Sequence, residues 1–152
     1  MRRRTFLRNL FPALIGSFAS FLHSRESFAV WPETHFLKGE FDSRFRQLFA
    51  DQPILDSDEI NIDLPKIAEN GAVVPITISS ELEQIRRIYI WVEKNPTPLA
   101  AEFELDESVE VYLTARIKMA ETCPITVIAE QGNRLLRKQQ WVKVMQGGCG
   151  TG

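Results

Sequence analysis

The sequence predicts a mainly β protein, an immunoglobulin-like antiparallel β-sandwich with a short N-terminal helix and a flexible C-terminal arm. Three observations favour this fold. After Pro53, apolar residues recur at every second position in several short runs, as they do in half-buried strands. Turn-forming residues such as glycine, proline and asparagine separate these runs. Strands do not alternate with helices as a parallel sheet would require, so a sandwich of antiparallel sheets is the expected solution.

The N-terminal helix is expected within residues 30–52. There Phe41, Phe45, Leu48 and Phe49 follow one another at i, i+4, i+7 and i+8, which places them along one stripe of a helix. Polar residues occupy the positions between them. We therefore expect this helix to pack its aromatic stripe against the sheet.

Six or seven short strands are expected after the helix. They correspond to Ile60-Asn61-Ile62-Asp63-Leu64 and to the runs VVPITIS, IYIWV, LAAEFEL, VEVYLTARIKMA, CPITVIAE and QQWVKVM. Pro75 indicates an edge position or a bulge in its strand, because proline cannot donate to a ladder. The run Ile88–Val92 is apolar at every position, which is typical of a central strand covered on both faces. Gln131-Gly132-Asn133 predicts a turn between the last two strands.

Residues 1–29 are interpreted as a twin-arginine-type export signal that is removed from the mature protein. Arg3 and Arg4 stand in a basic region, the apolar run from Leu10 to Leu22 follows, and small residues end the segment. A permanent anchor is disfavoured because 13 residues are fewer than the roughly 20 that a spanning helix needs. General secretory export is the other alternative. The remaining organisation is a sandwich over residues 30–145 and a glycine-rich arm over residues 146–152.

Composition excludes several classes of function. Residues 1–29 hold five of the 18 basic and one of the 20 acidic residues, which leaves 13 basic and 19 acidic residues and a net charge of −6 in the mature chain. A chain of this charge offers no cationic face for nucleic acid. His35 is the single histidine outside the signal and is expected to be a solvated residue before the helix, so no metal site is predicted. The carboxylates of EFELDESVE are expected on the solvated face of a strand, and no resident cofactor or catalytic site is predicted.

The two cysteines differ in their surroundings. Cys123 precedes Pro124 at the start of a strand, where a partly buried thiol is ordinary. Cys149 is flanked by Gly147, Gly148 and Gly150, which leave the thiol unshielded and the backbone free to reorient. From Val144 to Cys149 the chain can extend by roughly 16–18 Å.

Three interpretations of Cys149 remain open from the residues alone. A disulfide with Cys123 would suit an exported binding module. A catalytic thiol would need a nearby base or positive charge, which a glycine tail does not supply. A substrate carrier, which presents its thiol to active sites of other proteins, agrees best with a mobile and accessible cysteine.

The ending VKVMQGGCGTG resembles the Gly-Gly-Cys-Gly-Gly tail of the SoxY family, the sulfur-carrying subunit of the periplasmic SoxYZ complex of thiosulfate oxidation. The resemblance extends through AENGAVVPITI, IWVEKNPTPLA and ARIKMAETCPITVIAEQGNRL. It implies that Cys149 is the covalent sulfur attachment site, that Gly147, Gly148 and Gly150 form the arm, and that the chain is not an enzyme. The family ends in Gly-Gly after the cysteine, whereas this chain has Gly150-Thr151-Gly152.

The resemblance also implies partners and a compartment. A SoxZ-like subunit would complete a heterodimer in the periplasm, without a membrane anchor after signal cleavage. A c-type haem enzyme of the SoxAX type would load thiosulfate onto the cysteine, and a SoxB-type hydrolase would release sulfate. A molybdenum–haem enzyme of the SoxCD type, where present, would oxidise the remaining sulfane sulfur. Cys123 has no role in this scheme.

Overall fold

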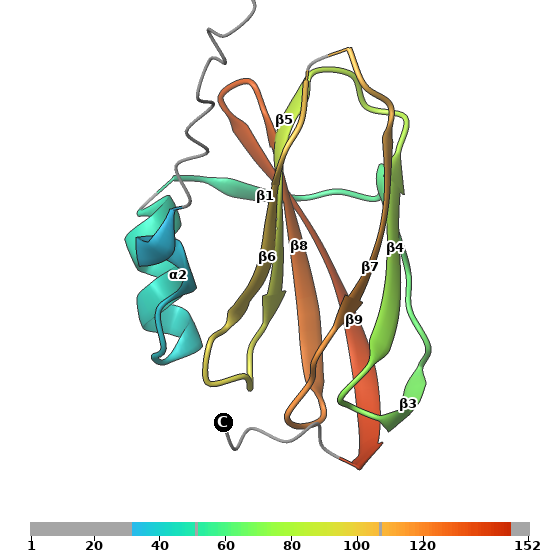
Figure 1. The fold of residues 1–152 in the computed structure, drawn as a ribbon. Helices are drawn as coiled ribbons and strands as arrows, with labels where there is room; N and C mark the ends of the chain where they lie inside the picture. The colour runs from blue at the N-terminus through green and yellow to red at the C-terminus, as the bar shows by residue number, and fades with distance from the viewer. Residues whose placement is uncertain (1–31, 51, 107, 147–152) are drawn as a thin grey trace, which may run out of the picture. The chain divides into compact units, whose positions relative to one another are not determined.

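The computed structural model describes residues 32–50, 52–106 and 108–146, which belong to one unit spanning residues 32–152. Two β-sheets pack face to face, and one α-helix covers part of the outer face of the larger sheet (Figure 1). This is a mainly β sandwich consistent with the immunoglobulin-like architecture expected from the sequence.

The described chain begins with a 3-10 turn, η2 (Glu33–Phe36), and the helix α2 (Phe41–Phe49). Nine strands follow, more than the six or seven expected. They are β1 (Ile54–Asp56), β2 (Ile60–Asp63), β3 (Ile67–Asn70), β4 (Val74–Ser80), β5 (Ile85–Val92), β6 (Leu99–Glu104), β7 (Val111–Ile117), β8 (Cys123–Gln131) and β9 (Arg134–Gln146). The larger sheet has the order β1-β9-β8-β5-β6, with β3 also paired to β9, and the smaller has the order β2-β4-β7.

The space between the sheets is filled by aliphatic side chains that alternate along the strands. On β4 and β8, every member of this core comes from one parity of its strand, as a half-buried pleated strand requires. On β5, Ile88, Ile90 and Val92 share one parity, and Ile85 precedes a register shift in the pairing with β8. The fully buried large residues of this core are Ile60, Ile76, Ile78, Ile85, Ile88, Ile90, Met119, Ile125 and Leu136, whereas Trp91, Leu99 and Ile128 are fully buried on the helix side. Burial of each such side chain contributes roughly 1.5–3 kcal/mol relative to exposure.

The central strand β5 is covered on both of its faces, as its apolar run predicts. Ile88 and Ile90 face the core between the sheets, whereas Tyr89 and Trp91 face the helix. The predicted stripe of α2 covers these two rings, and the rings of Phe45 and Trp91 meet at 5.3 Å. The expectation that the helix packs against the sheet is confirmed, although α2 occupies only nine of the residues 30–52.

The edge of the larger sheet departs from the antiparallel expectation. Both β1 and β3 run parallel to β9, one near its start and the other near its end. Between them the chain crosses to the smaller sheet and forms β2 there. Strands of three and four residues need no crossover helix here, because β9 is long enough, at 13 residues, to pair with both along one edge.

Pro75 lies in β4, the middle strand of the smaller sheet, and its register with β7 is continuous, so the bulge is wrong. The predicted edge position is correct for Pro75 itself. β2 pairs only with Thr77 to Ser80, so within this sheet Pro75 has a neighbouring strand, β7, on one side only. The predicted turn at Gly132 joins β8 to β9, and its φ of 56° is one that glycine adopts without strain.

Candidate functional site

The last strand is held by hydrogen bonds as far as its final residue. The amide of Gly71 donates to the carbonyl of Gln146 at 2.8 Å, next to the pairing of Asn70 with Gln146. On the other side, the amide of Val144 donates to Oγ1 of Thr122 at 2.9 Å. Gln146 is therefore a fixed point from which the segment that carries Cys149 begins. The structured part of β9 extends one residue into the segment 146–152 that the sequence assigns to the arm.

Two loops contact this fixed end of β9 and a third is joined to one of them, and Figure 1 shows the β3–β4 and β7–β8 connections at the same end of the sandwich as the tip of β9. We call residues 71–73, 93–98 and 118–122 together with Val144–Gln146 the arm-root platform. The loops are joined to one another by hydrogen bonds. The amide of Met119 donates to the carbonyl of Gly71 at 2.7 Å. Gly71 thus contacts both the end of β9 and the β7–β8 loop.

Asn95 connects the third loop to the second. Its Nδ2 donates to the carbonyl of Lys118 at 2.7 Å, and its Oδ1 accepts from the amide of Ala120 at 2.9 Å. The sequence assigned Asn95-Pro96 only the role of ending a strand, so this bridge was missed. The signal that could have found it is the amide itself, since asparagine in a loop commonly replaces backbone hydrogen bonds.

Cys123 lies directly beneath this platform as the first residue of β8. Its side chain is free and completely buried, not partly buried as expected. Burial raises the pKa of the Cys123 thiol, against a smaller opposing effect of backbone hydrogen bonds from Lys94 and Glu93. A buried neutral thiol is a poor nucleophile and a poor partner for disulfide exchange. Cys123 is therefore a core residue.

The only histidine in the described part of the chain lies before the helix α2, as predicted, but it is half-buried against the sheet. His35 lies in η2, and its Nδ1 is 2.7 Å from Oε2 of Glu102 on β6. The Glu102 side chain is 11% exposed, and Oε1 of the same carboxylate is 3.9 Å from Nε of Arg87. The expectations of a solvated His35 and of solvated carboxylates throughout EFELDESVE are therefore wrong at these two residues. The pair connects the N-terminal segment to the sheet, which needs a long-range contact that sequence spacing does not report.

The described residues offer little for chemistry of their own. In the ranges 32–50, 52–106 and 108–146, no group of three or more histidine, cysteine, aspartate or glutamate side chains could hold a metal ion. A surface hollow of about 980 Å³ is lined mainly by the loops that follow β4 and precede β7, away from the end of β9, and half of its lining residues are serine or glutamate. Within the same ranges, no helix has the length and apolar character to cross a membrane.

The predicted site residues themselves lie outside the described residues. These are Cys149, Gly147, Gly148 and Gly150 of the arm and Arg3 and Arg4 of the signal. What the structure adds is the point of attachment. From Gln146 the backbone needs three steps to reach Cys149, so their Cα atoms are separated by at most about 11 Å. This reach is shorter than the roughly 16–18 Å expected from Val144, because β9 stays paired as far as Gln146.

Comparisons with known proteins agree on one family. The family model for the sulfur oxidation protein SoxY matches residues 45–149. Among solved structures, the chain is similar to the sulfur carrier protein SoxY from Chlorobium limicola f thiosulfatophilum, with 32% sequence identity and a TM-score of 0.62. That match covers 69% of this chain and 96% of the other. No curated protein sequence matches the chain.

Proposed function

The chain belongs to the SoxY family of sulfur oxidation proteins, and from this membership we propose that it is a non-catalytic covalent carrier whose sulfur attachment site is Cys149. The observation that carries the proposal is the hydrogen-bonded end of β9, which stops three residues before the cysteine. A rigid body followed by a short glycine segment suits a thiol that enters the active sites of other proteins. The family match, which extends to residue 149, supports the same residue.

Loading joins thiosulfate to the thiolate by a new sulfur–sulfur bond. Cys149–S⁻ and ⁻S–SO₃⁻ combine to Cys149–S–S–SO₃⁻ and release two electrons, which a c-type haem enzyme of the SoxAX type accepts. Hydrolysis by a SoxB-type enzyme then breaks the bond between the sulfane and sulfonate sulfurs. Water supplies the fourth oxygen of sulfate, two protons are released, and the persulfide Cys149–S–S⁻ remains. A SoxCD-type enzyme, where present, would oxidise that persulfide.

In this scheme the chain needs no resident cofactor, because the haem, manganese and molybdenum centres belong to the partner enzymes. A SoxZ-like β-sandwich is proposed as its constant partner in a heterodimer. Co-expression followed by size-exclusion chromatography with light scattering tests this pairing. Elution of the chain as a stable monomer in the presence of the SoxZ-like protein would contradict it.

The proposed compartment is the periplasm, reached by the twin-arginine route. Arg3 and Arg4 carry this proposal. The double variant Arg3→Lys, Arg4→Lys should accumulate as precursor in the cytoplasm, whereas the unchanged chain is exported. Normal export of the double variant would exclude this route.

The central test is intact mass spectrometry of the mature chain after incubation with thiosulfate and the SoxAX-type enzyme. We expect the mass of one thiosulfate adduct on the wild-type chain and on Cys123→Ala, and no adduct on Cys149→Ser. An adduct on Cys149→Ser would contradict the carrier assignment. The alternative of a disulfide-stabilised binding module predicts a dominant Cys123–Cys149 bridge in a non-reducing peptide map, and nothing in the buried, free Cys123 favours it.

A further inference from the structure

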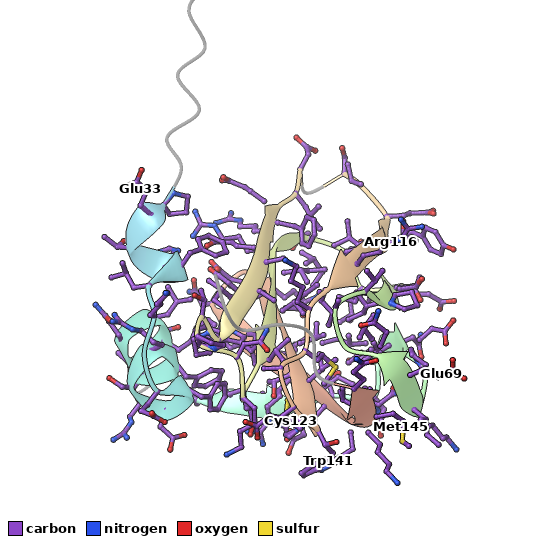
Figure 2. All side chains as sticks on the ribbon, turned by 60° about the horizontal axis from the view of Figure 1, so that its bottom comes forward. Glu33, Glu69, Arg116, Cys123, Trp141 and Met145 are labelled. Carbon is purple, nitrogen blue, oxygen red and sulfur yellow. The ribbon has the colours of Figure 1, made fainter. Side chains whose placement is uncertain are left out.

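An apolar patch lies on the outer face of the larger sheet beside the arm root. Ile67, Trp141 and Met145 are 55%, 67% and 63% exposed. Ile67 pairs with Lys143, which lies between Trp141 and Met145 along β9, and alternate residues of a strand share a face. Sheet spacing therefore places Ile67 about 8 Å from each of the other two. We call these three residues the β3–β9 patch, and Figure 2 shows Trp141 and Met145 at the periphery of the domain.

The helix α2 does not cover this part of the sheet. Its aromatic stripe packs on Tyr89, Trp91, Ile128 and Leu135, near the start of β9. The outer face of the larger sheet is therefore apolar at both ends of β9. The helix covers it near the start of β9, whereas near the end of β9 it is exposed. Three large apolar side chains exposed together on a chain this acidic are typical of a surface that another protein covers.

The length of the arm indicates which protein that is. Gln146 is fixed, and the Cα atom of Cys149 lies at most about 11 Å from it. An enzyme that receives the sulfur on Cys149 in a recessed site must therefore bring its entrance into contact with the surface around Gln146. An interface that buries roughly 800 Å² of this chain, if centred on the arm root, extends about 16 Å in every direction. Such an area includes Met145 and Ile67 and reaches Trp141.

Resting on the proposed carrier function, we propose that the β3–β9 patch is the docking surface for the entrance of the enzyme that loads Cys149. The matching surface on that enzyme is an apolar rim around a slot too narrow for a folded domain. Docking on the patch sets the depth to which the arm enters, because the arm is too short to reach the site from a distance.

The experiment measures the initial rate of thiosulfate loading by the SoxAX-type enzyme, as a function of carrier concentration, for the wild-type mature chain and four variants. The test variant is Trp141→Glu, Met145→Glu, and the matched control is Tyr112→Glu, a residue 71% exposed on β7 of the other sheet. The other two chains carry about four glycines inserted after Gln146, with and without the test substitutions, which extends the reach to at most about 25 Å. Alkylation of Cys149 by iodoacetamide monitors the thiol itself.

We expect the test variant to lose about tenfold in kcat/KM, the effect of removing interface residues that bind, while Tyr112→Glu changes little. In the extended arm the same substitutions should cost much less, because the longer arm no longer depends on close docking. Iodoacetamide should react equally with all five chains. Circular dichroism and the unfolding midpoint verify that the variants are folded.

Two outcomes would overturn the proposal while leaving the carrier function intact. In the first, the enzyme loads thiosulfate onto the test variant as fast as onto the wild-type chain. The other is a test variant whose slower loading coincides with loss of a SoxZ-like subunit or of a second copy from the complex in solution, which would assign the patch to that constant partner. If the wild-type chain gains no adduct at all, the carrier function itself fails.

Discussion

Replacing Asn95 by alanine removes both hydrogen bonds that join the β5–β6 loop to the β7–β8 loop. The lost contacts are the 2.7 Å bond to the carbonyl of Lys118 and the 2.9 Å bond from the amide of Ala120. A typical hydrogen bond contributes a net 0.5–1.5 kcal/mol or so, and two bonds together about 2 kcal/mol. The half-buried amide of Ala120 moves the cost toward the upper end of this range, because it loses its acceptor. The loss is a large part of the roughly 5–15 kcal/mol by which a domain is stable.

The free energy of unfolding can be measured by urea denaturation, followed through the fluorescence of the buried Trp91. Asn95→Ala should lower it by about 2 kcal/mol, whereas Asn61→Ala, at an exposed position of β2, should change it by less than about 0.5 kcal/mol. Hydrogen exchange should accelerate at the amides of Met119 and Gly71, which lie in the same network. A loss below 0.5 kcal/mol for Asn95→Ala, with exchange unchanged, would refute the idea that this side chain joins the loops.

Two further predictions concern buried titratable groups. Iodoacetamide at neutral pH should modify Cys149 but not the buried Cys123 in the native chain, and both after unfolding, and equal native rates would refute the assignment of Cys123 to the core. Burial raises the pKa of Tyr89 to about 12, against a lowering effect of Arg87, so folding favours the neutral phenol. The contribution of the neutral Tyr89 to the free energy of unfolding is fully present at a pH below 10.0, the ordinary pKa of tyrosine. This contribution is lost as the pH rises toward 12. Urea midpoints between pH 9 and pH 12 should therefore fall more steeply for the wild-type chain than for Tyr89→Phe, and parallel curves would contradict this.

The elements that the sequence predicted well are those in which a periodic pattern has a single structural solution. The stripe from Phe41 to Phe49 needs an apolar surface to cover, and Tyr89 and Trp91 provide one on the far side of β5. An unbroken apolar run in a strand has to be covered on both faces. In β5 the smaller sheet covers one face of the run Ile88–Val92 and the helix α2 covers the other. These predictions depend on side-chain periodicity, which secondary structure determines locally.

The features that the sequence did not reveal depend on contacts between distant residues. A strand of three residues such as β1 shows no measurable period, and its parallel partner lies about 80 residues away in β9. The pairing of His35 with Glu102 joins residues 67 positions apart, and the bridge made by Asn95 joins loops 25 positions apart. The cysteine motif could be found from composition because glycine neighbours are visible in the sequence, whereas the fixed end of β9 at Gln146 could be found only in the folded chain.

The parallel pairing of β3 with β9 has a mechanical consequence. In the proposed carrier, a pull on the arm is transmitted to the end of β9, and its component along the strand axis is opposed by the pairing of β9 with its neighbours. The hydrogen bonds between β9 and β8 are perpendicular to that axis, and those to β3 are slanted across it. A force in this direction shears many bonds together, whereas a force across the sheet would peel them apart one at a time. The component of such a pull that runs along β9 therefore loads the domain in its most resistant direction.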